Sequence, residues 1–406
     1  MAEAPCASGP TAQLAASPHD AVRWKITCMY RQLERVPSIL ERLTSLGQGQ
    51  LSAEVQEWVV GALMRDPYHA SHVIDVDYHR RLCKALFAAA ERSDDGVTDA
   101  LADEFEKRQC AAQQSRSGWC QKVWTYGVTG PVPGHLGTTA SDGASGCIAL
   151  GLSHDMLAGS TGCHEWEAGF WLAEYVLSNL AAFAGGRRKH CVELGCGAGV
   201  VGVALARVGA ASVLCTDGSP EAVANCDANL RLNGVGAGDN VRTALLRWED
   251  DPAGGPMPDC ILGADLLYDP RAVAPLLHAV TWLLQNTASH GGKGERRAPA
   301  AALIATVERN PDTLALFERE AERHAFLQAR RVAVPRVQAV SWHEFEALEA
   351  ARPRLLLHEL ALRAPGGQSP DCRTDPSACL RDFTALTFTT KGQRDPSVCN
   401  DPQLCD

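Results

Sequence analysis

One stretch of this chain combines residue types that could hold a small polar ligand. Between Cys191 and Gly202, a short apolar run leads into glycines at 195, 197 and 199, with Glu193 just before them and Cys196 among them. Glycines let the backbone turn sharply and approach a ligand, and the helix that follows directs its free N–H groups at whatever lies over the turn. The Glu193 carboxylate suits an ammonium group and would repel a pyrophosphate.

The next apolar run, Ser212 to Thr216, ends at Asp217, where a carboxylate could accept both hydroxyls of a ribose. A dinucleotide site would call for the spacing G-x-G-x-x-G, whereas this chain has G-x-G-x-G. An amino acid joined to a nucleoside fits these groups, and we therefore predict S-adenosylmethionine as the ligand. The alternative is a strand, turn and helix with a purely structural role.

A second reactive stretch is Asp265-Leu266-Leu267-Tyr268, which follows an apolar run ending at Ala264. A carboxylate and a phenol at this place could orient an amine or receive its proton. An acid after a strand can instead cap the next helix. Trp166 follows a Gly-Ser-Thr-Gly turn, where it could lie against the ligand or serve as a buried aromatic contact.

These residues need a scaffold, and the pattern downstream supplies one. Strand-like runs alternate with helical ones, which predicts a mainly parallel, doubly wound α/β sheet. The predicted strands are 212–216, 241–246, 259–264 and 301–307, and the predicted helices are 221–232, 271–284 and 311–327. Ligands of such sheets bind beyond the carboxyl ends of the strands. Gly195–Gly199, Asp217, Trp248 and Asp265–Tyr268 all fall at such ends, so we expect them to form one site.

The rest of the chain divides by composition. We predict a disordered leader at 1–20, a helical N-terminal module at 21–110, a linker or β-hairpin at 111–160 and the ligand-binding domain at 161–390. Within the last, 366–378 reads as an insertion, and 391–406 as a flexible tail. Three C-terminal runs are strand-like, although only two are needed to close the sheet: 331–334, 355–362 and 383–390.

Charge and cysteine usage narrow the possible partners. A net charge of −10 and a pI near 5.7 argue against direct binding to nucleic acid or an anionic membrane. Cys191, Cys196, Cys215 and Cys260 are spaced as buried small residues rather than as bridge pairs, which indicates a reduced, cytoplasmic setting. We expect no metal site, because His69, His72 and His79 are more typical of solvated or capping side chains, and Cys372, Cys379, Cys399 and Cys405 lack zinc-ligand spacing.

Taken together, several motifs resemble those of the seven-strand class I methyltransferases, and more narrowly the eukaryotic elongation factor 2 lysine methyltransferase family. The resemblance covers roughly residues 50 to 330. Its motifs are Thr161-Gly162 with Trp166-Glu167-Ala168, Leu172-Ala173-Glu174, Val192–Gly199, Asn229–Gly234, Ala264–Tyr268, and Arg309-Asn310-Pro311 before Phe317.

The resemblance implies a doubly wound, seven-stranded, Rossmann-like methyltransferase sheet with a helical N-terminal module. It also implies methyl transfer from S-adenosylmethionine to a lysine of elongation factor 2 by a monomer. Asp265 and Tyr268 would face the incoming lysine. The cofactor would contact Trp166, Glu193, Gly195, Cys196, Gly197, Gly199, Asp217, Trp248 and Ala264. Arg247 departs from the family pattern, in which an acid often precedes the tryptophan.

Overall fold

The computed structural model describes residues 18–65, 75–111, 118–128, 145–153, 161–184, 188–236, 240–250, 258–289, 300–335 and 338–363. The predicted insertion at 366–378, the tail at 391–406 and nearly all of the predicted leader lie outside these ranges. The described residues belong to the unit Met1–Pro365.

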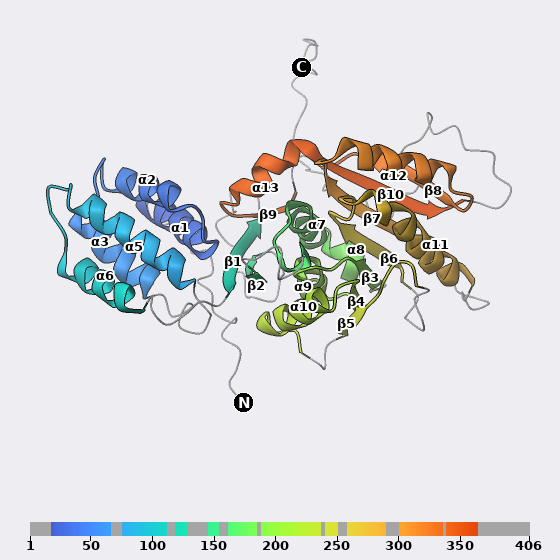
Figure 1. The fold of residues 1–406 in the computed structure, drawn as a ribbon, viewed down its shortest axis with the longest axis horizontal. Coiled ribbons are helices and arrows are strands. Elements are labelled where there is room, and N and C mark those ends of the chain that lie inside the picture. Colours follow the sequence, from blue (N-terminus) through green and yellow to red (C-terminus); the bar gives the residue numbers. More distant parts are fainter. Residues whose placement is uncertain are drawn as a thin grey trace, which may run out of the picture. The chain divides into compact units, whose positions relative to one another are not determined.

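A seven-stranded sheet in the order β5-β4-β3-β6-β7-β10-β8 confirms the predicted α/β architecture (Figure 1). Its strands are β3 (His190–Leu194), β4 (Ser212–Asp217), β5 (Val241–Leu245), β6 (Cys260–Ala264), β7 (Ala301–Val307), β8 (Leu327–Val332) and β10 (Leu355–Leu362). The neighbouring strands β5, β4, β3, β6 and β7 are all parallel, and β10 runs antiparallel to both β7 and β8. The chain reverses its winding direction between β3 and β6, which is where doubly wound sheets bind ligands.

Helices cover both faces of this sheet because successive strand residues point to opposite sides. Val192 and Leu194 belong to a buried cluster with α11 (Val273–Ser289) and α12 (Pro311–Arg323). Glu193, between them, faces α9 (Val200–Arg207), where its Oε2 lies 3.3 Å from a Cβ built on Gly202. The remaining helices of this region are α7 (Glu167–Ser178), α8 (Leu180–Ala184) and α10 (Pro220–Leu232), with short 3-10 turns at Thr161–Cys163 and Pro270–Ala272.

The two strands that close the sheet are β8 and β10, which resolves the choice among the three C-terminal runs. The third run, 383–390, lies outside the described residues. The predicted helix 311–327 is too long, because α12 ends at Arg323 and His324 already has an extended backbone, with ψ 130°. The chain then enters β8 at Leu327, four residues before the strand that the sequence suggested.

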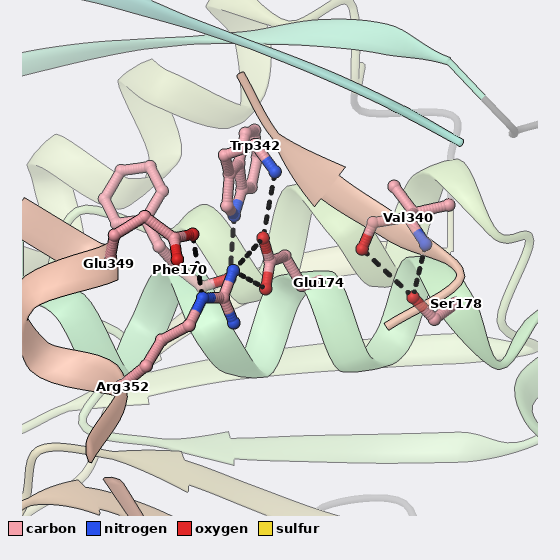
Figure 2. Close-up of polar contacts among 7 residues, drawn as sticks. All are labelled: Phe170, Glu174, Ser178, Val340, Trp342, Glu349 and Arg352. Atoms are coloured by element: carbon pink, nitrogen blue, oxygen red, sulfur yellow. Dashed lines mark hydrogen bonds and ion pairs between the residues drawn. The ribbon is translucent and has the colours of Figure 1, made fainter. Parts of the chain in front are cut away.

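A second, three-stranded sheet has the order β2-β1-β9. The hairpin of β1 (Trp119–Val128) and β2 (Gly146–Ser153) falls in the segment predicted to be a linker or hairpin. The third strand, β9 (Val340–Trp342), was not predicted. Figure 2 shows how polar groups of α7 hold it: Ser178 Oγ accepts from Val340 N (2.9 Å), and Glu174 accepts from Trp342 N (2.9 Å).

An ion pair extends this attachment to the chain that follows β9. The guanidinium of Arg352 donates to both oxygens of Glu174, at 2.9 Å each, and Trp342 Nε1 donates to Phe170 O at 2.9 Å (Figure 2). Arg352 opens a 3-10 turn, Arg352–Arg354, directly after α13 (Glu346–Ala351). Helix α7 is therefore tied by side chains to both β9 and the start of this turn.

The N-terminal module is helical, as predicted, and has its own buried cluster. Its elements are α1 (Pro18–Arg31), α2 (Val36–Leu46), α3 (Ala53–Trp58), a π-helix (Val59–Met64), α5 (Val76–Ala90) and α6 (Asp99–Ala111). The break between the first two helices lies at Leu33, which has φ +55°, rather than at Pro37. Pro37 instead sits in the first turn of α2, where its missing N–H would have no helical partner.

The histidine prediction for this module is wrong at one position and untested at two. His79 is buried at 1% exposure, stacked on Tyr30 with its Nε2 2.7 Å from the tyrosine hydroxyl, so it is neither solvated nor a cap. His69 and His72 lie outside the described residues. Among the residues the structure describes, no helix is both long and apolar enough to cross a bilayer.

Candidate functional site

The glycine turn leaves β3 at the carboxyl edge of the sheet in a left-handed conformation that favours glycine. Gly195, Gly197 and Gly199 have φ values of +65°, +51° and +86°. A Cβ on Gly195 would lie 2.5 Å from Leu266 Cδ2 and 3.6 Å from Trp248 Cζ2. The turn therefore lies directly beside the Asp265–Tyr268 segment and beside Trp248, two groups far apart in sequence that were predicted to share its site.

The segment that precedes Trp166 lies against the same turn. A Cβ on Gly197 would lie 3.0 Å from Gly162 O, so the segment before α7 passes close to the turn. The indole Nε1 of Trp166 donates to Thr161 O at 2.9 Å, which fixes the ring relative to that segment. Trp166 is partly buried and forms the N-cap of α7.

Asp217 stands at the end of β4, and its carboxylate supports the glycine turn. Its Oδ2 accepts from Gly197 N at 3.1 Å and its Oδ1 from Ser219 N at 2.9 Å. Because a carboxylate oxygen can accept two hydrogen bonds, these two leave acceptor capacity on both oxygens. That arrangement fits a pair of ribose hydroxyls.

Asp265 is the most constrained residue of the site. It has φ +53°, a left-handed backbone that is uncommon for residues other than glycine although better tolerated by aspartate. Its side chain is only 6% exposed, and it accepts hydrogen bonds from Ala168 N (3.2 Å), Val307 N (3.0 Å) and Arg309 Nη1 (2.8 Å). Asp265 thus joins β6, β7 and the start of α7. Tyr268 is 65% exposed beyond it.

Arg309 lies beside Asp265, Glu167 and Trp166, and together these residues form what we call the corner of the site. The sequence analysis assigned Arg309 no role. Its guanidinium pairs with Asp265 and with Glu167 and lies over the ring of Trp166, 5.1 Å from the ring centroid. Its pKa is raised: partial burial lowers it, but the hydrogen bonds and charges of the two carboxylates outweigh that effect. In the sequence, Arg309-Asn310-Pro311 stood out only as one of the motifs that carry the family resemblance, shortly after a predicted strand.

Glu193, near the end of β3, and Cys196, within the turn itself, are buried, with 3% and 5% exposure. Burial is the main reason that the pKa of Glu193 is raised well above its ordinary range, and the neighbouring Cys226 adds to it. Within the described part of the chain, Glu193 Oε2 has no hydrogen-bond partner. The pKa of the Cys196 thiol is also raised well above its ordinary range, chiefly by the neighbouring Cys226 thiol and by burial. Contact of either residue with a ligand stays a prediction.

Trp248 and Ala264 border the turn from the other strands. Trp248 is partly buried against the cluster that includes α11 and α12, while Arg247 before it is exposed. Ala264 ends β6, and its Cβ lies 4.0 Å from a Cβ built on Gly169 in α7. The four cysteines predicted to be buried are so, and the described residues contain no cluster of metal-binding side chains.

The fold and this corner define a class of protein. The chain winds outward from β3 to β5, returns beside β3 with β6 and β7, and places the antiparallel β10 between β7 and β8. This is the class I methyltransferase fold. The residues present fit its cofactor, S-adenosylmethionine: the glycine backbone leaves room for close approach, and Asp217 keeps acceptor capacity for a ribose.

Comparison with known proteins narrows the class. Residues 147–295 match the family model described as lysine methyltransferase. The chain is 29% identical over 178 residues to the protein-lysine N-methyltransferase EFM3 of Chaetomium thermophilum, covering 42% of this chain and 49% of that protein. It is 28% identical over 194 residues to the human protein-lysine N-methyltransferase EEF2KMT, covering 44% and 56%. This chain is therefore similar to lysine methyltransferases over residues 147–295, which include strands β3 to β6 of the seven-stranded sheet.

The matches have a limited extent. The chain spans about half the length of these curated relatives, 49% and 56% in the two cases. Among solved structures, cofactor-bound Rv0187 from MTB is 17% identical, with a TM-score of 0.32 over 49% of this chain and 80% of that one.

Proposed function

We propose that this protein is an S-adenosylmethionine-dependent protein-lysine N-methyltransferase that acts on translation elongation factor 2. The observation that carries the proposal is the contact between the glycine turn and the Asp265–Tyr268 segment, where Leu266 Cδ2 fills the space beside Gly195. This contact brings the expected cofactor turn and the expected substrate corner to one edge of the sheet. The similarity to lysine methyltransferases supports the choice of acceptor.

Each predicted site residue has a proposed part in holding the cofactor. The backbone of Gly195, Cys196, Gly197 and Gly199 would pass along it, and Asp217 would accept its ribose hydroxyls. Trp248 and Ala264 would line the adenine side, and Trp166 would cover the turn from the start of α7. Glu193, buried on β3 beside the turn, stays the candidate partner of the ammonium end.

The reaction needs a neutral amine held in line with an activated methyl group. When bound, the cofactor would supply that methyl on a sulfonium, whose thioether is the leaving group that keeps the bonding electron pair. A free lysine has a pKa of about 10.4, so its ammonium must first release a proton, here to solvent at the exposed side of the corner. Asp265 and Tyr268 would orient the nitrogen.

Asp265 would act chiefly by position, because three donors already occupy its carboxylate. Replacing it with Asn should keep the fold and cofactor binding within a few-fold, while methyl transfer falls by about a hundredfold or more. Asp265→Ala should be similarly inactive. Calorimetric titration with cofactor and mass spectrometry of purified elongation factor 2 after reaction measure the two effects.

A matched control is Asp269→Asn, a carboxylate in the same loop that pairs with the exposed Arg271. This variant should methylate as the unmodified protein does. If Asp265→Asn lost cofactor binding together with activity, Asp265 would be structural. Equal activity of both variants would rule out a catalytic part for it.

Other substrates remain testable in one experiment. Lysate from cells that lack the protein can be incubated with it and radiolabelled S-adenosylmethionine, and the labelled bands identified. Label on another protein, or on histidine, would replace elongation factor 2 as the proposed substrate. A chain that binds no cofactor at all would instead be a non-catalytic interaction module.

A further inference from the structure

The corner proposed to receive the lysine already contains a cation of the protein itself. Arg309 lies between the carboxylates of Asp265 and Glu167 and over the face of Trp166. Two carboxylates and an aromatic face are also what would attract the ammonium of a substrate lysine. The Arg309 side chain is 38% exposed, so a substrate side chain entering the corner would approach it directly.

The charges around this cation are few and largely paired. Two carboxylates and one guanidinium leave the corner with one net negative charge. On neighbouring segments, Lys122 pairs with Glu165 and Asp269 pairs with Arg271. Among the described residues, further titratable groups on these segments are His164 before α7, Tyr268 on the loop after β6, Glu308 directly after β7 and Asp312 at the start of α12; Glu308 and Asp312 are exposed. Arg309 is therefore the charge that most directly offsets Asp265 and Glu167.

The negative charge of the corner has two opposing effects on a substrate ammonium. Negative charge binds it, but negative charge also raises its pKa and so retains the proton that must leave before methyl transfer. A nearby positive charge has the reverse effect on both. With its guanidinium in place, the corner attracts the lysine through one net charge rather than two.

We infer that Arg309 is a positioning residue that sets the charge of the substrate corner, so that a lysine ammonium is drawn in but can still lose its proton. This inference rests on the proposed lysine methyltransferase function. Arg309 acts through the carboxylates and through Trp166 rather than on the transferred methyl group. Glu167 is its counterpart: it holds the guanidinium and supplies the second negative charge.

Two substitutions that each remove one charge change the net charge of the corner in opposite directions. Arg309→Gln leaves two negative charges, and Glu167→Gln leaves none in excess. For Arg309→Gln we expect a lower KM for the acceptor protein, a kcat at pH 7 reduced about tenfold, and a kcat–pH midpoint displaced about one unit to higher pH. For Glu167→Gln we expect a higher KM and a midpoint displaced to lower pH. Arg309→Lys, which keeps the charge but loses the fork geometry, should return the midpoint toward its original place.

Equilibrium binding of the acceptor protein in the presence of S-adenosylhomocysteine provides a readout without turnover. Here Arg309→Gln should bind more tightly and Glu167→Gln more weakly. Equal losses of kcat in both variants, with unmoved midpoints and unchanged acceptor binding, would overturn the inference and make the pair structural. If Arg309→Gln does not fold, a Glu167→Gln midpoint that stays in place overturns it alone. Failure of the proposed function would show differently, as absence of methylation by the unmodified protein.

Discussion

At the level of single residues, the glycine turn is held in place by its surroundings as much as by its own flexibility. Gly195 faces Leu266, and Gly197 faces the Gly162 carbonyl, so neither position has room for a side chain. Asp265 is the converse case, a residue with a Cβ held in a left-handed backbone by a network of donors. Such strain costs on the order of 1–3 kcal/mol and is found where the surrounding structure requires it.

This comparison predicts different outcomes for two glycine substitutions. Gly195→Ala and Gly234→Ala both place a Cβ at positive φ, +65° and +77°, and should share a strain cost of about 1–2 kcal/mol. At Gly195 the Cβ would also meet Leu266 Cδ2 at 2.5 Å, whereas no atom of the described residues lies within 4 Å of a Cβ at Gly234. We expect calorimetry to show at least a tenfold loss of cofactor affinity for Gly195→Ala and little change for Gly234→Ala. Recovery in Gly195→Ala/Leu266→Ala would confirm the contact as the cause, and equal affinities of the two single variants would contradict it.

At the level of elements, the parallel strands could be predicted because most of them are short apolar runs followed by a polar or glycine-rich turn. Gly195, Asp217 and Asp265 follow or end β3, β4 and β6. Because ligands bind at the carboxyl ends of such strands, this position alone was enough to predict that the three residues share a site. Strand β9 could not be predicted, because its three residues carry too little pattern and its pairing partner β1 is about two hundred residues earlier in the chain. The partners of Arg309 were hidden for the same reason, since Glu167 and Asp265 become its neighbours only when the sheet forms.

The attachment of β9 and the Arg352 turn to α7 should be measurable as stability. Glu174 is fully buried, and burial raises its pKa even though Arg352 opposes that effect. Arg352→Met would leave this carboxylate without its cation, for which the loss should be about 3–5 kcal/mol in chemical denaturation. Glu349 also pairs with Arg352 but is 61% exposed, so Glu349→Gln should cost at most about 1 kcal/mol. Similar losses for the two variants would mean that burial does not set the strength of these pairs.

At the level of the whole molecule, two buried clusters share no residue. One is formed by the N-terminal helices, from Ile26 to Leu101, and the other by the seven-stranded sheet with α11 and α12, from Val192 to Leu360. The residues proposed to hold the cofactor all belong to the domain that contains the second cluster. Cofactor binding should therefore stabilise that domain and leave the helical module as it was.

Hydrogen exchange of the full chain can separate these responses. With S-adenosylhomocysteine at about one hundred times its Kd, the free energy of opening should rise by about 2.7 kcal/mol in elements that bind it, which slows their exchange by about a hundredfold. We expect this protection in peptides from 190–205, 212–219 and 260–268, and none in peptides from 76–90. Gly195→Ala, measured at the same ligand concentration, should lose most of the protection. Protection that extended equally into 76–90 would contradict independent opening and show that the helical module responds to the cofactor, whereas protection absent from 260–268 would separate the Asp265 corner from the cofactor site.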